Sequence, residues 1–74
     1  MNDAVIDRVI ELLSESVELS PDDPDAHFYF GSVLKMNGDI QRAIKHFKKC
    51  VELKSNYTEA IRELRLLRSR SRPK

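Results

Sequence analysis

The sequence predicts an all-α fold, an antiparallel array of helical hairpins, from three observations. Apolar residues recur at spacings of three, four and seven in four separate segments, which is the period of an amphipathic helix. Clusters of proline, glycine, asparagine, aspartate and serine separate these segments. No segment shows the sustained alternation of apolar and polar residues that is typical of a half-buried strand. Because the connections are only two to four residues long, we expect neighbouring helices to be antiparallel.

The first two helices are predicted at 3–19 and 24–36. The first ends where two prolines fall within SPDDPD, a stretch of turn-forming residues. Asp23 is the expected N-cap of the second helix, because its side chain can accept a hydrogen bond from a free backbone N–H. Pro24 follows at the first helical position, where its missing N–H has no cost.

The last two helices are predicted at 40–54 and 57–70. The NGD stretch at 37–39 supplies a glycine that ends the second helix and an aspartate that caps the third. Asn56 and Glu59 have the spacing of a capping box, which we expect to begin the fourth helix.

Length and composition predict one small domain. The chain has 74 residues, of which we assign 1–70 to a single helical domain and 71–74 to a basic disordered tail. The single cysteine allows no intrachain disulfide. Together with the two histidines it offers three soft or nitrogen ligands, whereas a structural zinc site needs four at set spacings, so no such site is predicted. No apolar run reaches the ~18 residues that a membrane-spanning helix needs. Asp3 and Asp7 put negative charge at the start of the first apolar segment, where a secretory signal has positive charge. A cytoplasmic location is therefore expected.

The charged residues are distributed unevenly, although the net charge is only +1. Residues 1–26 contain eight acids and one base, whereas residues 27–74 contain twelve lysines or arginines and four acids. The resulting charges of −7 and +8 predict a strong electrical dipole, which matters for steering and for self-association.

The sequence also contains an internal repeat with a period of 34 residues. VELSPDDPDA at 17–26 aligns with VELKSNYTEA at 51–60, with Val, Glu, Leu and the final Ala identical. The same shift places apolar residues of the first helix on apolar residues of the third. This period, in helix–turn–helix units, is the signature of one repeat family.

The chain resembles the tetratricopeptide repeat (TPR) family. Gly31, Ala43 and Phe47 match the glycine, alanine and phenylalanine of the family pattern. His27 and Ser55 stand where that pattern has tryptophan and proline. A glycine inside a helix costs about 1 kcal/mol relative to alanine, so it needs a packing reason. We expect Gly31 to meet Ala43 where the two helices cross closely.

The resemblance implies about one and a half repeats and a C-terminal capping helix. One complete repeat covers 24–57, and residues 3–23 resemble the second helix of a preceding repeat. Residues 58–70 resemble the capping helix. Arg65 and Arg68 make the face that a further repeat would bury polar, so we expect the array to end there.

As a TPR-like chain, the protein is expected to be an interaction module that binds a peptide or protein segment on the concave face of the repeat helices. The residues expected on that face are Asp25, Phe28, Ser32, Lys35, Met36, Asn56 and Tyr57. Phe28 and Met36 have two interpretations at this stage. Their side chains are either exposed contact groups or pack against neighbouring helices.

An alternative function is that of a small homo-oligomeric structural unit. The first helix has no preceding partner helix in this sequence, and its apolar stripe is wider than that of the third helix. Unpaired apolar surface favours association with another chain. The residues expected to form that contact are Val5, Val9, Leu12, Leu13 and Ser16.

Catalytic, cofactor and nucleic-acid functions are not predicted. His46 and Cys50, four residues apart, are the nearest combination of a base and a nucleophile. Cys50 lies on the apolar stripe, so we expect a buried thiol and a solvated histidine. The sequence has no glycine-rich phosphate loop. The basic C-terminal end lacks the interleaved aromatic residues that stack on bases, so nucleic-acid binding is unlikely.

Overall fold

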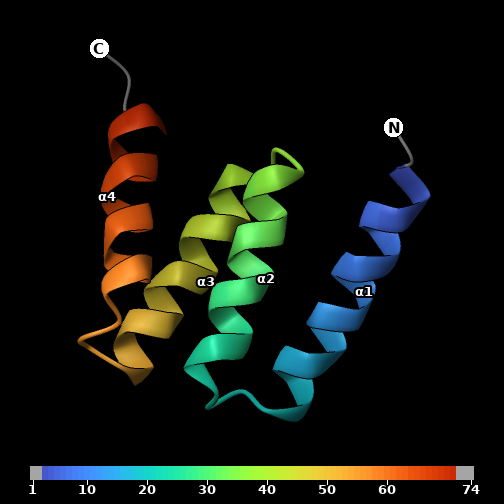
Figure 1. Ribbon diagram of the computed structural model, residues 1–74, viewed down its shortest axis with the longest axis horizontal. Helices are drawn as coiled ribbons and strands as arrows, with labels where there is room; N and C mark the ends of the chain where they lie inside the picture. Colours follow the sequence, from blue (N-terminus) through green and yellow to red (C-terminus); the bar gives the residue numbers. More distant parts are fainter. Residues whose placement is uncertain (1–2, 72–74) are drawn as a thin grey trace.

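The computed structural model describes residues 3–71 and contains four α-helices, with no strand in that range. They are α1 (Asp3–Leu19), α2 (Pro24–Met36), α3 (Ile40–Leu53) and α4 (Thr58–Ser71). Figure 1 shows that α1 and α3 run in one direction and that α2 and α4 run in the other. The fold is therefore all-α, a TPR-like array of antiparallel helical hairpins.

Polar caps fix where α2 and α3 begin. The Asp23 carboxylate accepts a hydrogen bond from the backbone N–H of Asp25 at 3.0 Å, directly before Pro24 at the first helical position. The Asp39 carboxylate accepts from the backbone N–H of Arg42 at 3.4 Å. Between these helices Gly38 has a φ of 87°, a left-handed conformation that favours glycine and that reverses the chain.

The start of α4 differs from the sequence prediction. The helix begins at Thr58, whose hydroxyl donates to the backbone oxygen of Asn56 at 3.4 Å. Within the described part of the chain, no side-chain bond joins Asn56 to Glu59, so the expected capping box is wrong. Of the tail predicted at 71–74, Ser71 ends α4 and the other residues lie outside the described range.

The hydrophobic core lies where α2, α3 and α4 meet. Its buried side chains are Phe30, Leu34, Ala43, Phe47, Cys50, Ala60, Leu64 and Leu67. From α1, only partly buried side chains reach this cluster: Ile10, Leu13 and Val17. Helix α1 therefore covers an edge of the core and leaves much of its own apolar surface open.

The reason for a glycine at position 31 is the aromatic ring of Phe47. A Cβ atom at Gly31 would lie 3.0 Å from Cε1 of that ring and 3.1 Å from Cδ1. The sequence predicts Ala43 as the neighbour of Gly31, but the three atoms nearest to this Cβ position all belong to Phe47. Ala43 is fully buried in the same core, but the ring of Phe47 lies directly over the glycine.

Candidate functional site

The centre of the face formed by α2 and α4 is an aromatic cluster around Phe28. The Phe28 ring lies 5.1 Å from the Tyr57 ring and 5.6 Å from the Phe47 ring, measured between centroids. The Tyr29 ring makes a T-shaped contact with Phe28, with 5.9 Å between the ring centroids. Phe28 is half-buried and packs against the core. The sequence left open whether this side chain is an exposed contact group or packs against neighbouring helices. Most of its surface packs within the chain.

A hydrogen bond between Tyr57 and Asp25 closes one end of this cluster. The Tyr57 hydroxyl donates to Oδ1 of Asp25 at 2.7 Å, which joins the start of α4 to the start of α2. Partial burial, followed by the hydrogen bond to Asp25 and the charge of its carboxylate, raises the pKa of Tyr57 above its usual range. Tyr57 is therefore a donor at neutral pH, with its ring orientation fixed. Lys54 lies over the other side of this ring, 5.7 Å from the centroid.

An ion pair joins the same two helices farther along the face. Lys35 Nζ lies 2.8 Å from Oε1 of Glu63, and the two side chains remain partly exposed to solvent, at 33% and 25%. The hydroxyl of Ser32, between the two bridges, donates to the backbone oxygen of Phe28 at 3.0 Å. Asp25, Lys35 and Glu63 therefore have partners within the chain before any ligand binds.

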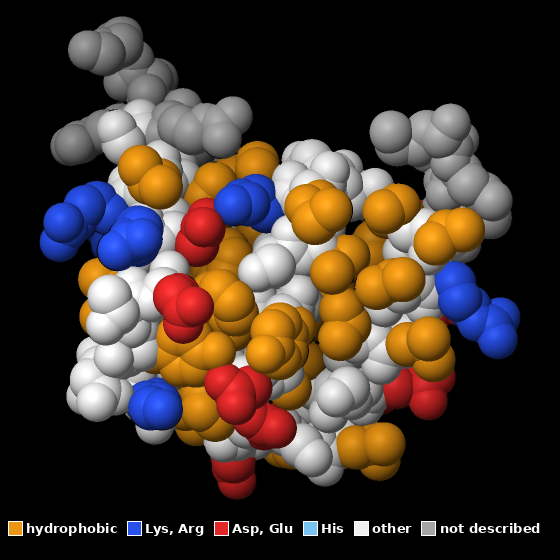
Figure 2. Space-filling view, viewed as in Figure 1, with side chains coloured by type: hydrophobic (Ala, Val, Ile, Leu, Met, Phe, Trp, Pro, Cys, Tyr) orange, Lys and Arg blue, Asp and Glu red, His pale blue; other side chains and the backbone are white. Residues whose placement is uncertain are grey.

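The structure brings part of the predicted set together. Tyr57 contacts both Asp25 and Phe28, whereas Met36 is 75% exposed and Asn56 is exposed in the turn before α4. Figure 2 shows apolar side chains between α4, on the left, and α2, bordered by acidic and basic groups. Sequence reasoning missed Glu63, because no local motif marks a residue whose partner depends on how α4 packs.

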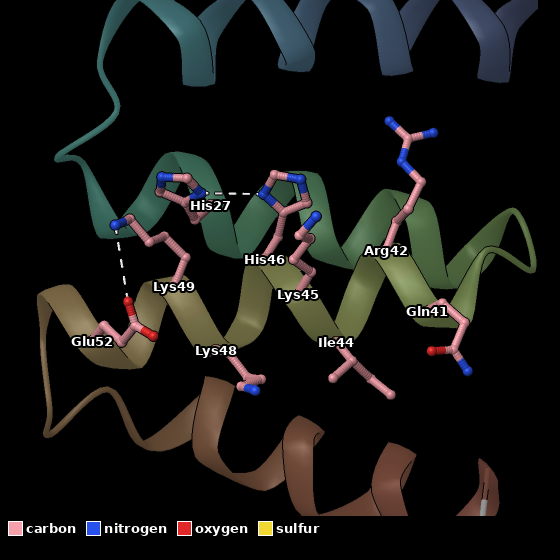
Figure 3. A pocket seen from close by; sticks show the side chains of 9 residues that line it. All are labelled: His27, Gln41, Arg42, Ile44, Lys45, His46, Lys48, Lys49 and Glu52. Carbon is pink, nitrogen blue, oxygen red and sulfur yellow. Dashed lines mark hydrogen bonds and ion pairs between the residues drawn. The ribbon is translucent and has the colours of Figure 1, made fainter.

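A second concave feature lies against α3 and shares no residue with the predicted set. It is a hollow of about 810 Å³. Its lining residues are His27, Gln41, Arg42, Ile44, Lys45, His46, Lys48, Lys49 and Glu52. Figure 3 shows the two imidazole rings side by side, with cationic side chains of α3 around them. Sequence reasoning missed this hollow, although the repeated cations of α3 were visible.

The two histidines form a chain of hydrogen bonds with fixed directions. Nε2 of His27 lies 2.9 Å from the backbone oxygen of Pro21, which can only accept, so this nitrogen carries a hydrogen. In the neutral pair Nδ1 of His27 is then an acceptor, and Nδ1 of His46, 3.2 Å away, donates to it. The chain ties the loop after α1 to both α2 and α3.

His46 is not the solvated side chain that the sequence predicted. Its ring is half-buried, with its centroid 4.4 Å from that of Phe30 and 5.4 Å from that of His27. Burial, and then electrostatic interaction with His27, Arg42 and Lys45, lower the pKa of His46 to about 4. The protonated form of His46 is disfavoured because the hollow is already rich in cations.

Cys50 is a core thiol, as predicted. It is fully buried, and this burial raises the pKa of the thiol to about 11, so the reactive thiolate is scarce at neutral pH. Within residues 3–71, no group of three or more His, Cys, Asp or Glu side chains could hold a metal ion.

The set predicted for self-association is divided between two environments. Val5 and Leu12 are 55% and 56% exposed, and Ser16 is also exposed. Val9 is half-buried, and Leu13 packs against the core. The open apolar surface of α1 is therefore narrower than the predicted set.

Comparison with known proteins gives a family for this architecture. The family model described as "Tetratricopeptide repeat" matches residues 12–45, from the middle of α1 to the first half of α3. No curated protein matches the chain. Among the described helices, none has the length and apolar character needed to cross a membrane. TPR arrays are generally protein–protein interaction modules, typically without catalytic activity. The repeat period, the helical hairpins and this match together support the assignment of the chain to the tetratricopeptide repeat family.

Proposed function

We propose that the chain binds a peptide or protein segment on the face formed by α2 and α4. The observation that carries the proposal is the Phe28–Tyr57 aromatic pair, which lies between the Asp25–Tyr57 and Lys35–Glu63 bridges. Binding surfaces commonly combine a rigid aromatic centre with a polar border. The remaining predicted contacts are Ser32 and Met36, farther along α2, and Asn56, in the turn before α4.

The polar bridges limit the chemistry of the segment that binds. A charged partner group would have to break an existing pair, which yields little net free energy at a solvent-exposed site. Met36 offers a flexible apolar side chain, and Asn56 offers an amide with free donors and acceptors. The preferred segment therefore has one apolar anchor next to the aromatic pair and hydrogen-bonding groups beside it.

The test is a selection of peptides from a displayed random library, followed by NMR titration of the labelled protein. Binding on the α2/α4 face would shift the amide signals of Ser32, Met36 and Asn56. Met36→Glu should weaken binding about tenfold or more, because it places a charge at an apolar contact. Leu19→Glu is the matched control, since Leu19 at the end of α1 is also apolar and is 83% exposed. Signal shifts confined to α1 or to the hollow on α3 would contradict the proposal.

A second candidate function is a homo-oligomeric structural unit. It is supported by the exposure of Val5 and Leu12 on a helix that packs on one side only. Leu12→Glu should then reduce the sedimenting mass at high protein concentration and leave peptide binding unchanged. An unchanged mass would remove this apolar contact from consideration.

A further inference from the structure

The outer surface of α1 carries a stripe of exposed charged residues. Arg8, Glu11, Glu15 and Glu18 follow one another at spacings of three, four and three residues, and all are exposed. These spacings place the four side chains on one face of the helix. Within the described residues, none of the four forms an ion pair.

The equivalent stripe on α3 has a complementary charge pattern. Arg42, Lys45, Lys49 and Glu52 have the same spacings, and the 34-residue repeat relates each of them to one residue of the α1 stripe. All four line the hollow on α3. Their internal ion pairs are weak, because Lys49 lies 3.9 Å from Glu52 and Arg42 pairs with Asp39 on an exposed surface.

Two helices that meet in opposite directions would bring these stripes into register. The order of the α1 stripe is reversed relative to α3, and its spacing of three, four and three reads the same from either end. The four pairs formed in this way are Arg8–Glu52, Glu11–Lys49, Glu15–Lys45 and Glu18–Arg42. All four pair opposite charges. In the parallel arrangement two of the four pairs, Arg8–Arg42 and Glu18–Glu52, would be like-charged.

We propose that the charged stripe of α1 docks, in the antiparallel direction, into the hollow on α3 of a second copy of this chain. Each copy keeps a free α3 hollow at one side and a free α1 stripe at the other. The contact is thus heterologous and propagates from copy to copy.

This association is electrostatic and therefore depends on ionic strength. Exposed charge pairs are weak individually, and the contact involves only one helix from each copy, so the assembly is a reversible one. Salt at about 1 M shortens the Debye length to about 3 Å and should dissociate the copies, whereas about 0.01 M leaves it near 30 Å. This mode is independent of the α2/α4 face and of the apolar contact considered above.

Sedimentation velocity of the full chain at low and high salt, over a range of protein concentrations, tests the proposal. The wild type should sediment faster with increasing concentration at low salt and as a single chain at high salt. Two double variants reverse the charges of one stripe each. The α1 variant carries Glu11→Lys and Glu15→Lys, and the α3 variant carries Lys45→Glu and Lys49→Glu. Each should associate on the order of 100-fold more weakly than the wild type. An equimolar mixture of the two variants should recover the association, because each then offers the charge that the other needs.

A variant with Arg62→Glu and Arg65→Glu is the matched control. It changes the net charge as much as the α3 variant does, at exposed positions on α4 outside the stripe, and should associate like the wild type. Circular dichroism of each variant checks that the helices are retained, and recovery in the mixture requires folded chains. A monomeric wild type at low salt, association that survives both reversals, or a mixture that stays dissociated would each overturn the proposal.

Discussion

The ring of Phe47 packs directly over Gly31, and this contact sets how closely α2 and α3 approach. A Cβ atom at Gly31 would be 3.0 Å from the nearest ring carbon, closer than carbon atoms normally pack. Phe47 is fully buried, with Phe28 beside it, so the ring has little room to move away. The helical propensity lost at the glycine is offset by this close packing.

Gly31→Ala should lower the free energy of unfolding by about 1 kcal/mol. The gain of about 1 kcal/mol in helix propensity is outweighed by overpacking, which typically costs about 1–3 kcal/mol. Urea denaturation followed by circular dichroism measures the difference. Gly31→Val should cost more, since it adds volume against the same ring. A more stable alanine variant would show that the ring moves aside and that the close contact does not constrain the hairpin.

Phe47→Ala should remove most of the stability of the domain. Phe47 is the largest fully buried side chain, and truncation of a buried phenylalanine typically costs about 3–5 kcal/mol. A domain of this size usually has a total stability of about 3–5 kcal/mol. A thermal melt of the variant should therefore show little or no cooperative unfolding transition. Phe47→Leu, which keeps much of the volume, serves as the control and should retain a transition.

Sequence patterns predicted the helices because their signals are local. Asp23 and Asp39 cap α2 and α3 as expected, and the 34-residue repeat predicted the hairpin architecture that the family comparison supports. Capping signals depend on residues within one helical turn of each other, so they can be recognised in the sequence without knowledge of the tertiary structure.

The contacts between helices were less predictable, because they depend on rotation about each helix axis. A small rotation decides which side chain lies nearest to Gly31, and the sequence alone does not specify it. The Lys35–Glu63 pair and the stacking of His46 on His27 depend in the same way on how α2, α3 and α4 pack. The candidate binding face was therefore predicted as a set of α2 positions, and its partner groups on α4 were not.

Lowering the pH from 7 to 5 should destabilise the fold through His46. Its pKa falls from 6.5 to about 4 on folding, so the unfolded chain binds the proton more tightly and stability is lost as the pH falls from about 6.5 towards 4. The groups that surround the ring are His27, Arg42 and Lys45, all of which oppose its protonation. We expect a loss of about 1 kcal/mol by pH 5, allowing for the partial exposure of the ring.

His46→Leu isolates this contribution, because the repeat places Leu12 at the equivalent position of α1. Urea denaturation at both pH values gives the pH-dependent difference for each protein. The variant should lose about 1 kcal/mol less than the wild type between pH 7 and pH 5, whatever its absolute stability. Equal losses in the two proteins would mean that carboxylates, and not His46, control the acid sensitivity.

Tyr57→Phe should separate the polar and aromatic roles of this residue on the α2/α4 face. The variant keeps the ring beside Phe28 but removes the 2.7 Å hydrogen bond to Asp25, which links the starts of α4 and α2. The free energy of unfolding should fall by about 0.5–1 kcal/mol, the usual net value of a hydrogen bond at a solvent-accessible position. Tyr57→Ala should cost more, because it also removes the ring. Urea denaturation of both variants measures the two losses, and equal losses would show that the hydroxyl alone accounts for the contribution of Tyr57.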